Sequence, residues 1–221
     1  MIITCISASN IKHAKDNSTS SEICNLIKEM VIKKTKNLIT VKIIKLVDYE
    51  LSPCIGCGQC FKKTICVNDE DFNNIYSKVI KSDGLFVVSA HYAPIPSKLS
   101  ILLEKMEQLT FLPRFHKEED RSPLYNKPVG IIGHGGGTEE IIKGYKGVVL
   151  NTIANALSYP IEMNILGVNE EWPNGIALPI KEVIRDENSI FPIQKYDWED
   201  IKVRIEPLVN NMIGNIIATR K

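Results

Sequence analysis

The sequence lacks an excess of charge of either sign. Its 221 residues include 27 lysines and arginines against 26 aspartates and glutamates, which leaves a formal net charge of +1. The charges are spread along the chain, and no basic arm stands out. Because binding of a phosphate backbone depends on clustered positive charge, we do not expect a nucleic-acid partner.

Long apolar runs and targeting features are also missing. No stretch approaches the ~20 consecutive apolar residues that a membrane-spanning helix needs. The apolar run Met1–Ser7 has no basic segment before it and no small-residue cleavage site after it, as a secretory leader would. The sequence also contains no internal repeat. We therefore expect a cytoplasmic protein without membrane contact that forms one domain over residues 1–221.

Three common motifs are absent as well. The chain has no Gly-x-Gly-x-x-Gly and no Gly-Lys-Ser/Thr, which disfavours a Rossmann-bound dinucleotide and a nucleoside triphosphate. It contains a His-Gly-Gly-Gly run of the kind found in esterases, but no Gly-x-Ser-x-Gly accompanies it. We therefore do not expect a serine hydrolase.

What is present is a regular alternation of apolar runs and amphipathic stretches, each pair long enough for a strand and a crossover helix. The runs predict five strands, at Met1–Ser7, Val41–Val47, Gly84–Ala90, Pro128–Gly133 and Ile161–Val168. Because parallel strands need crossovers of about a dozen residues, the pattern predicts an α/β fold with a parallel sheet and helices on both faces.

The amphipathic stretches predict the helices and two excursions. Helices are expected at Ser20–Lys34 with Ser20 and Ser21 as caps, after Asp69, at Lys98–Leu109, around Val148–Leu157, and at Trp198–Ile217 with a kink at Pro207. The segments Phe111–Asn126 and Asn169–Lys195 are rich in proline and charge, and we expect surface excursions there. A C-terminal extension thus begins at about residue 169.

The loops after the first, third and fourth strands are the expected ligand loops, because ligands bind beyond the carboxyl ends of parallel strands. The first is crowded with hydroxyls and leads into a helix N-terminus, which suits either a phosphate or a solvated cap. The third carries an aromatic residue between backbone amides, which suits a flat heteroaromatic ligand or simple packing at a strand end. The fourth is glycine-rich and suits close approach of a ligand or a tight turn.

The candidate residues in these loops share a place at a strand end. They are Ser7, Ser9, Ser18, Thr19 and Ser20 in the first loop, Ser89, Ala90, His91, Tyr92 and Ala93 in the third, and His134, Gly135, Gly136 and Gly137 in the fourth.

Four of the six cysteines, Cys54, Cys57, Cys60 and Cys66, fall within thirteen residues. Gaps of two residues let successive thiolates surround one inorganic centre, as in iron–sulfur proteins, and favour a [4Fe–4S] cluster. Zinc, redox-active thiols and a cysteine pattern without metal are the alternatives. Structural zinc usually takes two separated pairs of cysteines, so it is less favoured.

The cysteine motif and the three loops resemble the NAD(P)H-dependent FMN reductase superfamily of flavodoxin-like proteins, in its iron–sulfur flavoprotein branch. The resemblance covers about Met1 to Tyr159, and Asp69-Glu70-Asp71 matches the acidic helix start that follows the cysteines in that branch. Ser7-Ala8-Ser9 stands where the family has Ser-Pro-Arg, and Ser89-Ala90-His91-Tyr92 stands where it has Ser-Pro-x-Tyr. The resemblance implies a doubly wound five-stranded sheet with FMN held by the three loops.

The resemblance also implies a function. FMN would take a hydride from NAD(P)H, or single electrons from a [4Fe–4S] cluster, and pass them to a small-molecule or protein acceptor. No side chain is expected to act as acid or base, although His91, Tyr92 and His134 are expected to tune the flavin. A homodimer or homotetramer is implied. A cluster-free NAD(P)H:FMN or quinone reductase, a non-enzymatic electron carrier and a zinc-stapled binding module remain as alternatives.

Overall fold

A parallel sheet forms the centre of the computed structural model, which describes residues 1–11, 18–116, 121–159, 161–187 and 192–219. The strand order is β2-β1-β3-β4-β5, with all neighbours parallel. The strands are β1 (Ile2–Ala8), β2 (Thr40–Lys45), β3 (Gly84–Ala90), β4 (Pro128–His134) and β5 (Asn164–Leu166). The predicted α/β class and the flavodoxin-like strand order are thereby confirmed.

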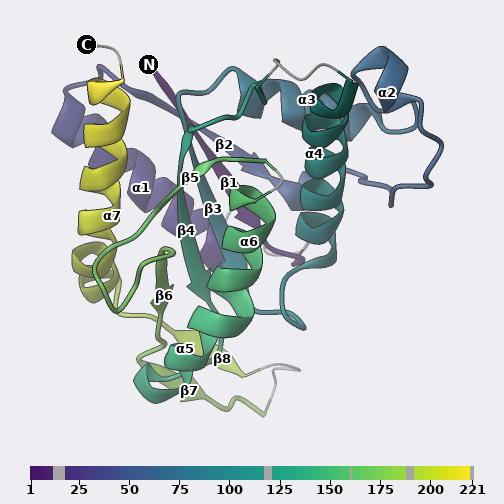
Figure 1. Ribbon diagram of the computed structural model, residues 1–221. Helices are drawn as coiled ribbons and strands as arrows, with labels where there is room; N and C mark the ends of the chain where they lie inside the picture. Colours follow the sequence, from purple (N-terminus) through teal and green to yellow (C-terminus); the bar gives the residue numbers. More distant parts are fainter. Residues whose placement is uncertain (12–17, 117–120, 160, 188–191, 220–221) are drawn as a thin grey trace.

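Helices cover both faces of this sheet, as predicted (Figure 1). One face carries α1 (Thr19–Thr35) and α7 (Trp198–Ala218), and the other carries α3 (Glu70–Ile80), α4 (Ser97–His116) and α6 (Thr152–Ser158). Successive residues of a strand point to opposite faces. In β1, Ile3 and Cys5 therefore pack into the first core, and Ile6 and Ala8 pack into the second.

The edge beside β4 differs from the prediction. Instead of one strand at Ile161–Val168, the short β5 pairs with Pro128–Gly130, and β6 (Ile176–Leu178) pairs with Ile132–His134. The chain leaves the edge at Gly167, where a Cβ would lie 2.6 Å from the Pro173 carbonyl oxygen. It returns at Gly175, whose φ is +112°. Two glycines thus divide the edge into two short strands.

The predicted excursion at Asn169–Lys195 is also more ordered than expected. Besides β6 it contains an antiparallel hairpin of β7 (Glu182–Ile184) and β8 (Ile193–Lys195). Residues 188–191 lie outside the described part of the chain. The prediction of a surface excursion is therefore wrong for β6, whose three residues are buried. The three strands were not predicted, because strands of three residues are too short for a hydrophobic period to reveal.

Two helix boundaries were predicted wrongly. The N-cap of α1 is Ser18, not Ser20 or Ser21, because the Ser18 side chain accepts a hydrogen bond from the Ser21 backbone nitrogen. Helix α4 continues to His116, so the first six residues of the predicted excursion at Phe111–Asn126 are helical. Pro113 lies in the last turn of α4. Proline has no backbone N–H, so one helical hydrogen bond is lost there, close to the end of the helix. Residues 117–120 lie outside the described residues.

Some of the remaining helical segments follow the predicted pattern, and two short ones, η2 and α2, were not predicted. α5 (Glu139–Tyr145), a π-helical segment η3 (Lys146–Asn151) and α6 form one continuous helical stretch. A short 3-10 turn, η2 (Leu46–Asp48), follows β2, and α2 (Cys60–Lys63) lies within the cysteine motif. Helix α7 is assigned continuously through Pro207. Across the described ranges, no helix combines the length and apolarity that a membrane span requires.

Candidate functional site

The first predicted loop joins β1 to α1. Ser18 Oγ accepts a hydrogen bond from the Ser21 backbone nitrogen at 3.3 Å and donates to Ser21 Oγ at 2.9 Å. Ser21 Oγ also lies 3.0 Å from Ser7 Oγ, and all three side chains are buried. These hydroxyls therefore stabilise the turn from strand to helix. Residues 12–17, the middle of the predicted phosphate loop, lie outside the described residues.

Ser20 and His134 join the start of α1 to the end of β4. Ser20 Oγ lies 2.7 Å from His134 Nε2, and both side chains are buried. Burial lowers the pKa of His134 to about 4, so the imidazole is neutral at pH 7. The contact orients the ring of His134 and places the hydroxyl of Ser20 inside the protein.

The glycine loop, Gly135–Gly137, follows β4 and is enclosed by two tyrosines. The Gly137 N–H donates to the Tyr145 hydroxyl. The Tyr196 hydroxyl donates to the Gly135 carbonyl at 3.1 Å. A Cβ on Gly135 would lie 2.7 Å from Tyr145 Oη, and a Cβ on Gly137 would lie 3.1 Å from the same atom. Close packing therefore requires glycine at both positions.

The third predicted loop begins at the end of β3. The His91 backbone nitrogen donates to the His134 carbonyl at 2.8 Å, which continues the pairing of β3 with β4. The His91 ring stacks on Tyr145, with ring centroids 4.8 Å apart and an interplanar angle of 20°. The buried Ser89 hydroxyl donates to the Ala90 carbonyl at 3.0 Å. The loop thus presents a stacked aromatic pair at the edge of the sheet.

The three loops meet in one cavity of about 490 Å³ at the carboxyl ends of β1, β3 and β4. This cavity is the predicted flavin cavity, and eight predicted cofactor residues line it: Ser9, Thr19, Ala90, His91, Tyr92, His134, Gly135 and Gly136. Six further predicted residues lie around the cavity without lining it: Ser7, Ser18, Ser20, Ser89, Ala93 and Gly137. The structure thus gathers parts of all three predicted loops at one place.

Several residues of this region were not predicted. Ile11, Pro192 and Gln194 line the cavity, and Tyr145 and Tyr196 support the glycine loop. Pro192, Gln194 and Tyr196 all come from the C-terminal extension, which begins at about residue 169. Their part in the site depends on how the chain returns across the sheet edge, and no motif or spacing in the sequence indicates that path.

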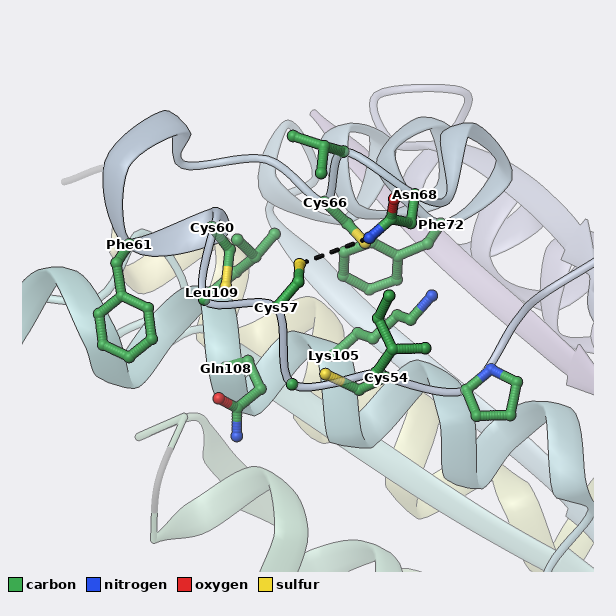
Figure 2. A pocket seen from close by; sticks show the side chains of 15 residues that line it. Cys54, Cys57, Cys60, Phe61, Cys66, Asn68, Phe72, Lys105, Gln108 and Leu109 are labelled. Carbon is green, nitrogen blue, oxygen red and sulfur yellow. Dashed lines mark hydrogen bonds between the residues drawn. The ribbon is translucent and has the colours of Figure 1, made fainter.

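The predicted metal ligands line a second cavity, of about 120 Å³. Figure 2 shows Cys54, Cys57, Cys60 and Cys66 around it, with Lys105 on the neighbouring helix α4. Cys54 and Cys57 are exposed, whereas Cys60 and Cys66 are half-buried. The structure therefore brings all four predicted cysteines to one cavity.

Asp69 closes the base of the cysteine loop, residues 53–68. Its Oδ2 accepts from the Ser52 backbone nitrogen at 2.9 Å and from Lys105 Nζ at 2.5 Å, and its Oδ1 accepts from the Phe72 nitrogen at 2.8 Å. Burial by itself raises the pKa of Asp69, but these three hydrogen bonds outweigh it, and the pKa is lowered. The ionised carboxylate thus joins both ends of the cysteine loop to α3 and α4.

Two asparagines contact the cysteines. Asn73 Oδ1 accepts from the Cys66 nitrogen at 2.9 Å, and Asn73 Nδ2 donates to the Cys66 carbonyl at 2.6 Å. Asn68 Nδ2 donates to Cys57 Sγ at 3.4 Å (Figure 2). Hydrogen bonds to sulfur are among the contacts that set the potential of iron–sulfur centres.

The chemistry of this donor set fits a soft metal centre. Thiolates are the ligands that zinc and iron–sulfur clusters prefer. Burial and the nearby charges of Cys54 and Cys57 raise the pKa of Cys60, so the thiols are close enough to interact electrically. Among the residues that the structure describes, however, no three His, Cys, Asp or Glu side chains converge closely enough to hold a metal ion. The ligands therefore stand around one cavity in an open arrangement.

The two cavities lie at different places along the chain around helix α4. His91 and Tyr92 of the flavin cavity precede its first residue, Ser97. The cysteine cavity is lined by Lys105 and residues further along α4. Eight residues of helix correspond to about 12 Å along the axis. The two cavities share no lining residue within the described chain.

The strand order and the cavity at the carboxyl edge of the sheet define a flavodoxin-like α/β protein. The chain belongs to the NADPH-dependent FMN reductase family, whose model matches residues 1–172. The predicted family membership is confirmed, and this family consists of oxidoreductases.

Two solved structures illustrate the shared fold. An oxidoreductase of Corynebacterium diphtheriae superposes with a TM-score of 0.59 at 14% identity, over 98% of this chain and 97% of that chain. The NAD(P)H:acceptor oxidoreductase FerB of Paracoccus denitrificans superposes with a TM-score of 0.52 at 10% identity, over 98% and 97%.

Two sequence relatives are iron–sulfur flavoproteins. The protein of Methanocaldococcus jannaschii is 28% identical over 85 residues, which are 38% of this chain and 44% of that protein. The protein of Methanosarcina thermophila is 35% identical over 57 residues, which are 25% of this chain and 30% of that protein. The matched segments thus span less than half of either relative.

Proposed function

We propose that the chain binds FMN in the flavin cavity and acts as an NAD(P)H-dependent oxidoreductase. The observation that carries the proposal is that parts of three loops, each ambiguous in the sequence, line one cavity of about 490 Å³ at the carboxyl edge of the sheet. Membership in the FMN reductase family supports the same ligand. Bound FMN supplies hydride transfer and single-electron exchange.

The residues of the cavity hold and orient this ligand. Ser9 and Thr19 lie where β1 leads into the N-terminus of α1, whose free N–H groups favour a phosphate. The glycine loop and the backbone at Ala90 and His91 border the remainder of the cavity, where a flat ring fits. His134 is neutral at pH 7 and in contact with Ser20, so it acts through its dipole and not through a charge.

The four cysteines support a second redox centre. We propose that Cys54, Cys57, Cys60 and Cys66 hold a [4Fe–4S] cluster, with Asn68 as a hydrogen-bond donor to the Cys57 sulfur. The iron–sulfur flavoproteins among the sequence relatives support this assignment. With such a centre beside FMN, the protein would pass electrons between partners that exchange two electrons and partners that exchange one.

A cluster-free NAD(P)H:FMN or quinone reductase is the second candidate. The open arrangement of the cysteines, in which no three ligands of the described chain converge, favours it. In that case the cysteines are thiols, and the acceptor takes two electrons from the flavin.

We also propose a homodimer or homotetramer. The two cavities share no lining residue within the described chain. The resemblance to the iron–sulfur flavoprotein branch implies that the cysteine loop of one copy approaches the flavin of another. The electron donor and acceptor are small molecules or carrier proteins.

The test is anaerobic purification followed by visible spectra before and after dithionite, with FMN, iron, sulfide and zinc counted per chain. One FMN with four iron and four sulfide supports the iron–sulfur flavoprotein, and one FMN without iron supports the cluster-free reductase. Cys57→Ala is expected to abolish iron binding. Cys24→Ala, which removes a buried thiol far from the cysteine loop, is expected to retain it. Rapid NADH or NADPH oxidation excludes a carrier without turnover, and absence of FMN contradicts the whole proposal.

A further inference from the structure

Tyr196 follows β8 and lies outside the part of the chain that matches the family model, which ends at residue 172. Its hydroxyl nevertheless contacts two of the three ligand loops. The Thr19 side chain hydrogen-bonds to the Tyr196 hydroxyl. The same hydroxyl donates to the Gly135 carbonyl at 3.1 Å. One half-buried side chain therefore links the start of α1 to the glycine loop.

The ring of Tyr196 contacts the site as well. It meets the His134 ring edge-on, with centroids 6.3 Å apart and an interplanar angle of 80°. On its other side it packs against Trp198, with centroids 5.8 Å apart. Trp198 begins α7, which packs on the sheet. Tyr196 is thus anchored to the core and presents its hydroxyl to the two loops.

The rest of the extension contacts the same loop. The Ile180 backbone nitrogen donates to the Gly137 carbonyl at 3.0 Å. A Cβ on Gly136 would lie 3.0 Å from Gln194 Nε2, so Gln194 packs directly against this glycine. Each residue of the glycine loop is therefore in contact with one residue beyond the family match.

We propose that Tyr196 is a positioning residue of the flavin cavity: its hydroxyl, bonded to Thr19 and Gly135, holds the N-terminus of α1 and the glycine loop at the separation that FMN requires. The inference rests on the proposed function. It makes the C-terminal extension part of the cofactor site, because this bridge adds a second link between the two segments beside the contact of Ser20 with His134. Gln194 also packs against this loop, at Gly136.

The first test needs no flavin. Hydrogen–deuterium exchange is measured on the full chain, without added FMN, for Tyr196→Phe and for the control Tyr159→Phe, whose side chain is 89% exposed. Tyr196→Phe retains the ring and removes the hydroxyl. Peptides covering residues 133–138 and 18–22 are expected to exchange about fivefold faster in Tyr196→Phe. Unchanged exchange in both peptides would overturn the bridge, even if the protein binds FMN.

The second test measures FMN affinity of the apoprotein by fluorescence titration. Tyr196→Phe is expected to raise the FMN Kd about fivefold to tenfold, the usual effect of losing one neutral hydrogen bond. Thr19→Val removes the second partner and is expected to raise the Kd by a similar factor, whereas Thr19→Ser retains the hydroxyl and restores it. The double variant Tyr196→Phe/Thr19→Val is expected to be no worse than the poorer single variant.

The outcomes separate the two proposals. If wild-type protein binds no FMN, the proposed function fails, and the exchange experiment still decides the role of Tyr196. If wild-type protein binds FMN and Tyr196→Phe binds it equally well with unchanged exchange, the role of Tyr196 is wrong while the function stands. Additive effects of Tyr196→Phe and Thr19→Val would likewise contradict a shared bridge.

Discussion

The flavin cavity is enclosed by contacts between distant parts of the chain, whereas one short segment supplies most of the cysteine cavity. Ser20 contacts His134, 114 residues away, and Tyr196 contacts Gly135, 61 residues away. The cysteine loop instead exposes its apolar side chains, with Ile55 73% exposed. Its backbone bonds to the body of the protein through Cys66, which contacts Asn73 of α3, and through Cys54, which donates to Glu104 of α4. Asp69 joins Ser52, Phe72 and Lys105 at its base.

This difference separates a cavity built by the fold from one that a ligand would organise. Buried hydrogen bonds fix the loops of the flavin cavity before FMN arrives, which lowers the ordering cost of binding. The cysteine loop presents ligands in an open arrangement, and metal sites commonly take their final form only when the metal binds. We therefore expect substitutions at the flavin cavity, and at the base of the cysteine loop, to affect folding more than substitutions within the cysteine loop.

The largest effect is expected at the base of the cysteine loop. Asp69→Ala leaves the Lys105 ammonium without its partner, and the side chains of this pair are only 1% and 4% exposed. Breaking such a buried pair costs about 3 to 5 kcal/mol of unfolding free energy. Urea denaturation measures this loss. Glu182→Ala breaks an exposed pair with Lys195 and is expected to cost less than about 1 kcal/mol. Equal losses would show that the base of the loop is not a buried anchor.

The next effect is a pH dependence from the flavin cavity. The pKa of His134 is lowered to about 4 from 6.5, so below pH 6.5 the unfolded chain binds a proton that the folded chain does not. Stability is therefore expected to fall by about 3 kcal/mol between pH 6.5 and pH 4 because of this group. Urea denaturation at several pH values measures it. His134→Gln is expected to lose this part of the slope, and an unchanged slope would contradict the assignment.

A smaller effect is expected from filling the glycine loop. A Cβ on Gly135 meets Tyr145 Oη at 2.7 Å, so Gly135→Ala is expected to lower the unfolding free energy by about 1 to 3 kcal/mol. FMN affinity is expected to fall in parallel, by about tenfold. Gly144→Ala is the matched control, because a Cβ there meets nothing within 4 Å. If both variants bind FMN as wild type does, the loop is not packed as described.

The smallest effect is expected inside the cysteine loop. Cys57→Ser in metal-free protein is expected to change the unfolding free energy by less than about 0.5 kcal/mol, because Cys57 is exposed. Loading wild-type protein with iron and sulfide is expected to slow deuterium exchange in residues 54–68 and to leave residues 133–138 unchanged. Strong protection of residues 54–68 before loading would show that the fold alone orders this loop.

Much of the architecture could be predicted from the sequence because buried parallel strands are continuous apolar runs. β3 lies at Gly84–Ala90 as predicted, and β4 extends one residue beyond the prediction, to His134. Helix α3 begins where Asp69 predicts it, since a carboxylate N-cap is a local signal. The fifth strand was predicted wrongly because Gly167 and Gly175 divide the edge through close backbone contacts with Pro173 and Ile131. A hydrophobic period does not reveal such contacts.

The candidate sites were predictable to different degrees. The cysteine motif is local, and all four predicted cysteines border one cavity. Each flavin loop was ambiguous by its own residues, and only the resemblance to the FMN reductase superfamily joined the three loops into one predicted FMN site. Ser7, Ser18 and Ser20 were all expected to contact a phosphate, but the structure places their hydroxyls in contacts with Ser21 and His134. A hydroxyl count does not show which way a side chain points.

The sequence by itself determined the first four strands of the sheet with their helices, and the cysteine motif. Each of these features depends on residues within one helix, strand or short loop, and the periodicity and spacing of such residues can be read from the sequence. Only the tertiary structure decided that Thr19, His134, Gly135 and Tyr196 meet. These contacts join residues far apart in the chain, and packing of α1 and α7 on one face of the sheet brings them within hydrogen-bond distance.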